Sequence, residues 1–182
     1  MMIKQVFALL LIATSFVSDS EERIIARQGQ VSFFSYTTVE NIKAENNQVL
    51  CIVDLQDGRI AVSMLMNAFV FEKALMKGHF NESYVESDLY PKGIFDGQII
   101  DFDPNKQGEQ IKLIQGTFTM HGVPNELNFK AKIENNNGQY TLDGTLETLV
   151  ADYDIKIPPL LTGNISDRIE VSFRFEFQPY EN

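Results

Sequence analysis

Residues 116–123, with the sequence Gly-Thr-Phe-Thr-Met-His-Gly-Val, decide how this chain folds. Phe118 and Met120 alternate with polar residues and lead into a turn that is expected at Gly122 and Pro124. Beyond the turn, apolar residues occupy every second position, namely Leu127, Phe129, Ala131 and Ile133. Alternation with a period of two on both sides of a turn is typical of antiparallel strands with one apolar and one solvated face.

The same alternation recurs along most of the chain. Strands are expected at residues 29–37, 42–54, 59–66, 94–102, 112–120, 126–134, 140–147 and 170–177. Asp57-Gly58 and Asn137-Gly138 are hairpin signals because these residue types tolerate a positive φ. About eight strands in hairpin order, with no linker between them, favour an all-β fold, an antiparallel up-and-down barrel, over a two-sheet sandwich.

The period changes between residues 69 and 90. Apolar residues fall there at helical spacing, at Phe71, Leu75, Met76, Phe80, Tyr84 and Val85. Gly78 and Asn81 interrupt the pattern, which predicts two short helical pieces rather than one long helix. This helical insert could cover an open end of the barrel or pack on the outside of the sheet, and the sequence leaves both open.

The first 20 residues are predicted to be a cleavable secretory signal. Lys4 supplies a positive start, residues 6–13 form an unbroken apolar run, and Ser18-Asp19-Ser20 offers a cleavage site between small residues. We therefore expect residues 21–182 to form one exported domain, periplasmic or secreted.

Charge and cysteine content exclude several classes of function. The formal net charge is −10 and the sequence has no basic cluster, which argues against nucleic acid and anionic membrane surfaces as partners. Cys51 is the only cysteine, so the chain has no internal disulfide, and its apolar neighbours predict a small core residue.

Local motifs give no support for catalysis. His79 and His121 lie far apart and neither has a neighbour at metal-ligand spacing, so no metal and no cofactor are predicted. His121 is expected to be a turn residue. Because catalytic groups can assemble across a fold, an enzyme remains a third hypothesis.

Three segments resemble the YceI-like family of exported bacterial proteins. Residues 116–124 are similar to the family segment G-x-L-T-x-H-G-V-x-K, residues 80–91 with Phe95 to its helical region, and residues 151–155 to its D-[FY]-x-I segment. The order and spacing match from about residue 29 to residue 177. Asn125-Glu126 departs from the family, which often has a basic residue there. The resemblance implies a lipocalin-like barrel that binds a polyisoprenoid or a related long-chain lipid.

Facing and alternation predict which residues would line the barrel interior. They are Phe33, Val62, Met64, Phe71, Leu75, Phe80, Phe95, Phe118, Met120, Phe129, Leu142, Phe173 and Phe175. Such a wall would hold a prenyl chain by burial, which is worth about 0.8 kcal/mol for each CH₂. The alternative is that these side chains simply fill the core.

Three hypotheses follow. The leading one is a non-catalytic exported protein that holds a polyisoprenoid or an isoprenoid quinone in the barrel. The second is a structural or interaction module whose barrel is filled by its own side chains, and the third is an enzyme acting on such lipids. The oligomeric state, a homodimer included, is left open.

Overall fold

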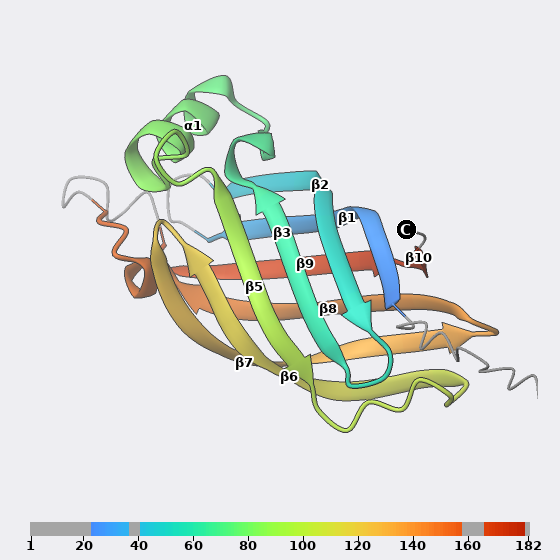
Figure 1. The fold of residues 1–182 in the computed structure, drawn as a ribbon. Coiled ribbons are helices and arrows are strands. Elements are labelled where there is room, and N and C mark those ends of the chain that lie inside the picture. The colour runs from blue at the N-terminus through green and yellow to red at the C-terminus, as the bar shows by residue number, and fades with distance from the viewer. Residues whose placement is uncertain (1–22, 37–40, 158–165, 181–182) are drawn as a thin grey trace, which may run out of the picture.

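The computed structural model describes residues 23–36, 41–157 and 166–180, and within them the chain forms a β-barrel (Figure 1). Its long strands are β1 (Arg23–Ser35), β2 (Ile42–Asp54), β3 (Arg59–Leu65), β5 (Lys92–Ile99), β6 (Gly108–Met120), β7 (Val123–Asn136), β8 (Gln139–Leu149) and β9 (Arg168–Glu176). Two short strands, β4 (Val70–Phe71) and β10 (Gln178–Pro179), add to the edges of β2 and β1.

The barrel is closed and antiparallel. Its strands follow the order β1-β9-β8-β7-β6-β5-β3-β2, and β2 pairs with β1 to complete the circuit of eight. This confirms the predicted all-β, lipocalin-like barrel. Most predicted strands are a few residues shorter than the observed ones, and the first strand begins at Arg23 rather than at residue 29.

The turn in the deciding stretch lies one step earlier than predicted. His121 and Gly122 have φ values of +54° and +74°, and Met120 pairs with Val123. Pro124 is therefore part of β7, where it faces Thr119, and the prediction of Pro124 as a turn residue was wrong. The signal at Asn137-Gly138 is confirmed, with φ values of +54° and +88°.

The signal at Asp57-Gly58 predicted a two-residue turn, but the loop takes four residues, 55–58. Leu55 is 3% exposed, so the chain turns only after this side chain has entered the core. Asp54 supports the loop by accepting the backbone N–H of Gln56 at 3.0 Å. Of the two predicted turn residues, only Gly58 has a positive φ.

The helical insert lies over the end of the barrel where β3 ends and β5 begins (Figure 1). A short 3₁₀ turn, η1 (Met66–Ala68), leads through β4 to the helix α1 (Ala74–His79) and the π-helical turn η2 (Phe80–Tyr84). Two short helical pieces are present, as predicted, but they adjoin directly, and the expected interruptions Gly78 and Asn81 lie inside α1 and η2. A further 3₁₀ turn, η3 (Val150–Tyr153), follows β8 at the same end.

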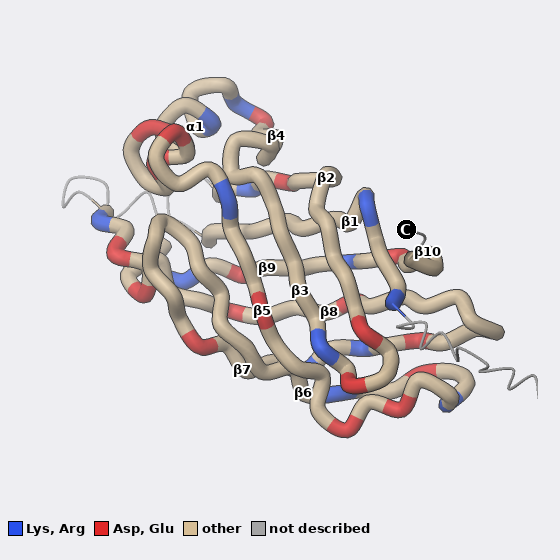
Figure 2. The backbone as a smooth tube through the Cα atoms, in the orientation of Figure 1, with Lys and Arg blue, Asp and Glu red and all other residues tan. Residues whose placement is uncertain are grey.

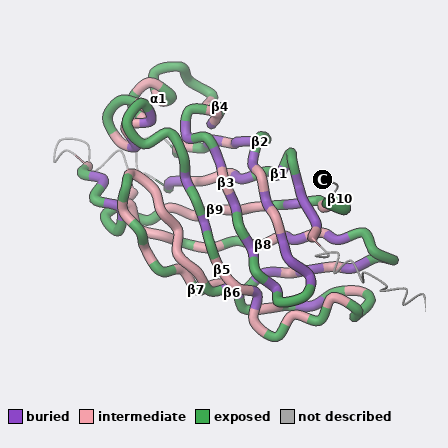
Figure 3. Tube along the Cα trace, viewed as in Figure 1, coloured by how far each residue is buried: buried purple, intermediate pink, exposed green. Residues whose placement is uncertain are grey.

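Burial follows the predicted alternation (Figure 3). On β3, for example, Ile60, Val62 and Met64 are buried, whereas Arg59 and Ala61 are exposed. Cys51 is fully buried, as expected of a core residue, and burial raises the pKa of its thiol.

Candidate functional site

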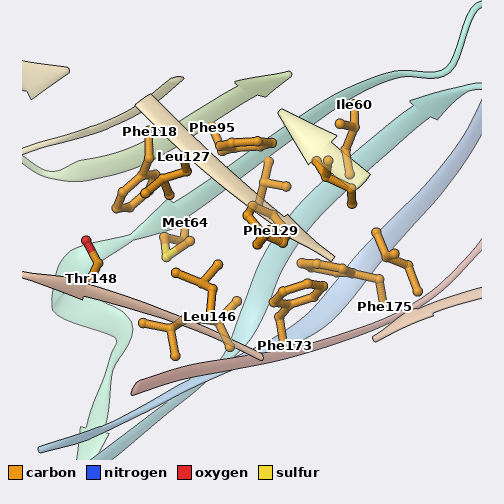
Figure 4. Close-up of a pocket in the computed structure, with 15 residues that line it drawn as sticks. Ile60, Met64, Phe95, Phe118, Leu127, Phe129, Leu146, Thr148, Phe173 and Phe175 are labelled. Carbon is orange, nitrogen blue, oxygen red and sulfur yellow. The ribbon is translucent and has the colours of Figure 1, made fainter. Parts of the chain in front are cut away.

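The barrel interior contains two adjoining apolar chambers. The inner chamber, about 90 Å³ in volume, lies among β3, β5, β6, β7, β8 and β9 (Figure 4). The outer chamber, about 430 Å³, lies beneath the helical insert and η3. Val31, Met64, Phe118, Thr148 and Val171 line both chambers, so the two spaces adjoin and these side chains form their common boundary.

Every predicted lining residue lies in the wall of at least one chamber. Those of the outer chamber are Phe33, Phe71, Leu75, Phe80 and Met120. Those of the inner chamber are Val62, Phe95, Phe129, Leu142, Phe173 and Phe175. Met64 and Phe118 lie at the junction. That these residues bind a ligand stays a prediction.

Sequence reasoning missed part of each wall. Leu127 and Leu146 continue the alternation of Phe129 and Leu142 and could have been included on that signal. Tyr153 belongs to the outer chamber but lies in η3, where no period of two or of 3.6 marks it. Only the three-dimensional fold brings it beside the barrel.

The walls carry almost no polarity and no fixed charge. Among the described residues, no Asp, Glu, Lys or Arg lines either chamber. Figure 2 shows the positions of these residues along the backbone, on strands as well as in loops. In the outer chamber, burial raises the pKa of the Tyr84 phenol, which is therefore neutral. The hydroxyl of Tyr153 accepts a long hydrogen bond of 3.4 Å from Thr148 Oγ1.

Aromatic rings shape both chambers. Phe33, Phe69, Phe71 and Phe80 cluster beneath the insert, with neighbouring ring centroids between 5.1 and 5.8 Å apart. Tilted, edge-on and stacked ring pairs of this kind stabilise one another beyond simple burial. The cluster packs the insert against β1, and its four rings form part of the wall of the outer chamber.

His121 joins three segments at the rim of the barrel. Its Nδ1 lies 3.0 Å from the carbonyl oxygen of Tyr153 and its Nε2 lies 2.7 Å from Glu86 Oε2. The carbonyl oxygen and an ionised Glu86 both accept hydrogen bonds, so this arrangement favours the imidazolium form, in which both ring nitrogens carry a proton. The ring of Tyr90 packs edge-on against it at 4.8 Å.

The pKa of His121 reflects two opposing causes. Partial burial acts to lower the pKa, but the hydrogen bonds to Glu86 and Tyr153 and the charges of Glu86 and Asp154 outweigh it. The net result is a pKa above the ordinary value of 6.5. Both nitrogens are engaged, so this histidine fastens the insert and η3 to the β6–β7 turn.

Within residues 23–36, 41–157 and 166–180, no group of three or more His, Cys, Asp and Glu is placed to hold a metal ion. The helices of this part of the chain are also too short and too polar to cross a bilayer.

Most of the chain matches a known protein family. A model of the YceI-like domain matches residues 23–177, which include all three segments quoted from the sequence. This chain belongs to the YceI-like family. A search of curated proteins found no match.

Several solved structures are similar to this barrel. A polyisoprenoid binding domain from Saccharophagus degradans, implicated in plant cell wall breakdown, has a TM-score of 0.75 and 15% identity, covering 87% of this chain and 99% of that one. BcnA from Burkholderia cenocepacia has a TM-score of 0.68 and 14% identity, covering 82% and 96%. The YCEI protein of Campylobacter jejuni has a TM-score of 0.59 and 14% identity, covering 81% and 90%. These likenesses show a common fold.

Proposed function

We propose that this protein binds one long-chain apolar lipid, a polyisoprenoid or an isoprenoid quinone, inside the barrel, and that it does so without catalysing a reaction. The observation that carries the proposal is the pair of adjoining apolar chambers inside the barrel, which no Asp, Glu, Lys or Arg of the described residues lines. The Saccharophagus degradans relative, described as a polyisoprenoid binding domain, supports the ligand class.

Burial supplies the binding energy in this proposal. Each CH₂ that leaves water contributes about 0.8 kcal/mol, so a chain of several isoprene units needs no ionic contact to bind firmly. Met64, at the junction of the chambers, has an unbranched side chain that can adapt to a flexible tail. A barrel filled by its own side chains would not leave an outer chamber of about 430 Å³.

The distribution of polar atoms suggests how the ligand is oriented. Among the described residues, Thr148 is the one polar residue in the wall of the inner chamber, whereas Ser35, His79 and Tyr84 line the outer one. We propose that the apolar tail occupies the inner chamber and that an uncharged head group, such as a hydroxyl or a quinone carbonyl, stays in the outer chamber. A neutral phenol at Tyr84 can donate a hydrogen bond to such an oxygen.

Export is a separate part of the proposal. We propose that residues 1–20 are removed and that the remaining chain works in the periplasm or outside the cell. The apolar run at residues 6–13 supports this. The intact mass of the protein from its own cells should correspond to a chain beginning at Glu21, and an unprocessed mass in the cytoplasmic fraction would refute export.

The binding test begins with native mass spectrometry of the protein purified from its own organism, followed by organic extraction. We expect an added mass that extracts as a prenyl lipid. The purified apo-protein should then bind geranylgeraniol saturably and gain about 2.7 kcal/mol of stability at a free ligand concentration of 100 times the Kd. An apo mass together with no saturable binding would overturn the proposal and favour the filled barrel.

A further inference from the structure

β7 and β8 are paired along only part of their length. Their register runs from Ala131 with Gly144 to Asn136 with Gln139. Beyond it, residues 123–130 of β7 pair with β6, and residues 145–149 of β8 pair with β9. Within the described ranges, the two facing edges therefore form an unpaired slot in the barrel wall.

The directions in which the backbone N–H and C=O groups of β7 point agree with the missing pairing at the slot. Each two-residue turn, at 121–122 and at 137–138, makes the two residues that flank it a hydrogen-bonded pair. The backbone N–H and C=O groups of odd-numbered β7 residues therefore point towards β6, and those of even-numbered β7 residues point towards β8. Pro124, which has no N–H to donate, lies on the β8 side. A proline is tolerated at this position because no ladder hydrogen bond is required there.

A similar splay on the other side of the barrel is bridged. β2 pairs with β3 only from Leu50 to Val53, but its earlier part pairs with β4. The side chain of Asn46 also donates a hydrogen bond of 2.9 Å to the carbonyl oxygen of Leu65, across the gap. The described residues form no such bridge between residues 123–130 and 145–149.

The slot is bordered by apolar side chains on its inner side and by polar side chains on its outer side. Leu127 and Phe129 from β7, with Leu146 and Thr148 from β8, line the inner chamber directly behind it and are partly exposed (Figure 4). The residues that alternate with them point outward and are exposed, namely Glu126, Asn128, Lys130, Thr145 and Glu147. A passage with apolar side chains on its inner side and polar ones at its outer edges suits an uncharged apolar chain, because carbon atoms of the protein would contact the chain.

Both ends of the slot are held. The Ala131–Gly144 pairing closes one end, and the hydrogen bond between His121 and the carbonyl oxygen of Tyr153 joins β7's turn to η3 at the other. The two unpaired edges are thus held in place at both ends of the slot.

We propose that this slot is a second opening of the cavity, through which the apolar chain of the ligand enters and leaves the inner chamber. The proposal rests on the proposed function. From the other end, the chain would have to pass the insert, its cluster of phenylalanine rings, and then Met64 and Phe118 at the junction. The slot reaches the inner chamber without disturbing any of these residues.

A disulfide across the slot tests the proposal. Lys130 and Thr145 are the next facing positions of the register after Ala131 and Gly144, and both point outward. The double variant K130C/T145C, once oxidised, should extend the pairing by one step and narrow the slot. The matched control is E134C/T141C, which occupies the same face where the strands are already paired. Cys51 does not interfere, because it is fully buried.

The probe is all-trans-retinol, a fluorescent isoprenoid alcohol. We expect oxidised K130C/T145C to load and release retinol several-fold more slowly than its reduced form and than the oxidised control. The Kd should stay unchanged, because blocking a route slows both directions equally. Equal rates in all forms would overturn the slot proposal alone, whereas failure of the unmodified protein to bind retinol or geranylgeraniol saturably would remove the proposed function together with it.

If the disulfide does not form, amide hydrogen exchange can test whether the edges of the slot are unpaired in solution. In the unmodified protein, the amides of Glu126, Asn128 and Lys130 should exchange quickly, since they face the slot. Those of Leu127 and Phe129, which face β6, should be protected. Equal protection of the two sets would show that the slot is closed in solution and would overturn the proposal.

Discussion

His121 is the residue whose protonation state matters most at the rim, because only the imidazolium satisfies both Glu86 and the Tyr153 carbonyl. Its pKa in the folded protein is raised above 6.5. A raised pKa means that the folded state binds this proton more tightly than the unfolded state does. The stability that it contributes is fully present below about 6.5 and is lost as the pH rises through the folded-state pKa.

We therefore expect the free energy of unfolding to fall across that pH range, as measured by urea denaturation. The control is His121→Asn, because asparagine tolerates the positive φ of this position but does not titrate. The difference in stability between the two proteins should shrink as the pH rises. Parallel profiles of the two proteins would contradict the assignment of an imidazolium.

A glycine is required at position 122 both by its backbone conformation and by a neighbouring side chain. Its φ is +74°, and a Cβ there would lie 2.7 Å from Cε1 of Tyr90. Gly108 offers a matched control, because its φ is +80° and nothing lies within 4 Å of its Cβ position. Gly108→Ala should lose about 1 kcal/mol from the left-handed backbone alone. Gly122→Ala should lose clearly more in the same urea titration, and equal losses would show that the Tyr90 contact does not matter.

At the scale of elements, the helical insert contains a position that can be improved. Gly78 lies inside α1, and a Cβ there meets nothing within 4 Å. Glycine in a helix costs roughly 0.5–1 kcal/mol relative to alanine. Gly78→Ala should therefore stabilise α1 and slow amide exchange within the insert. Unchanged or faster exchange there would contradict the helical state of this segment.

The sequence predicts the elements better than their connections. Alternation located the long strands because one face of each strand is buried, and the same alternation selected lining residues such as Phe129 and Phe173. The turn at Asp57-Gly58 was misjudged because the burial of Leu55, a tertiary effect, decides where the chain turns. The slot left no trace in the pattern, since Leu127 and Phe129 alternate whether or not β8 is paired beside them.

At the scale of the whole molecule, charge and cavity are separated. The net charge is −10, yet no Asp, Glu, Lys or Arg of the described residues lines either chamber. Salt screens interactions between exposed charges but leaves apolar burial almost unchanged. The affinity for a neutral prenyl alcohol such as geranylgeraniol should therefore be nearly independent of sodium chloride concentration, as measured by fluorescence competition with retinol. A steep loss of affinity with salt would indicate an ionic contact with the ligand.

The closure of the barrel has a consequence for biosynthesis. β1 pairs with β9, joining residues 30–34 to residues 170–174, so the two sides of this seam are separated by most of the chain. Contacts between such distant residues form late, because a long loop must close before they can contribute. A growing chain in which β9 has not yet been made has no enclosed interior. On the proposed function, the lipid can therefore be held only after β9 has been made and has paired with β1.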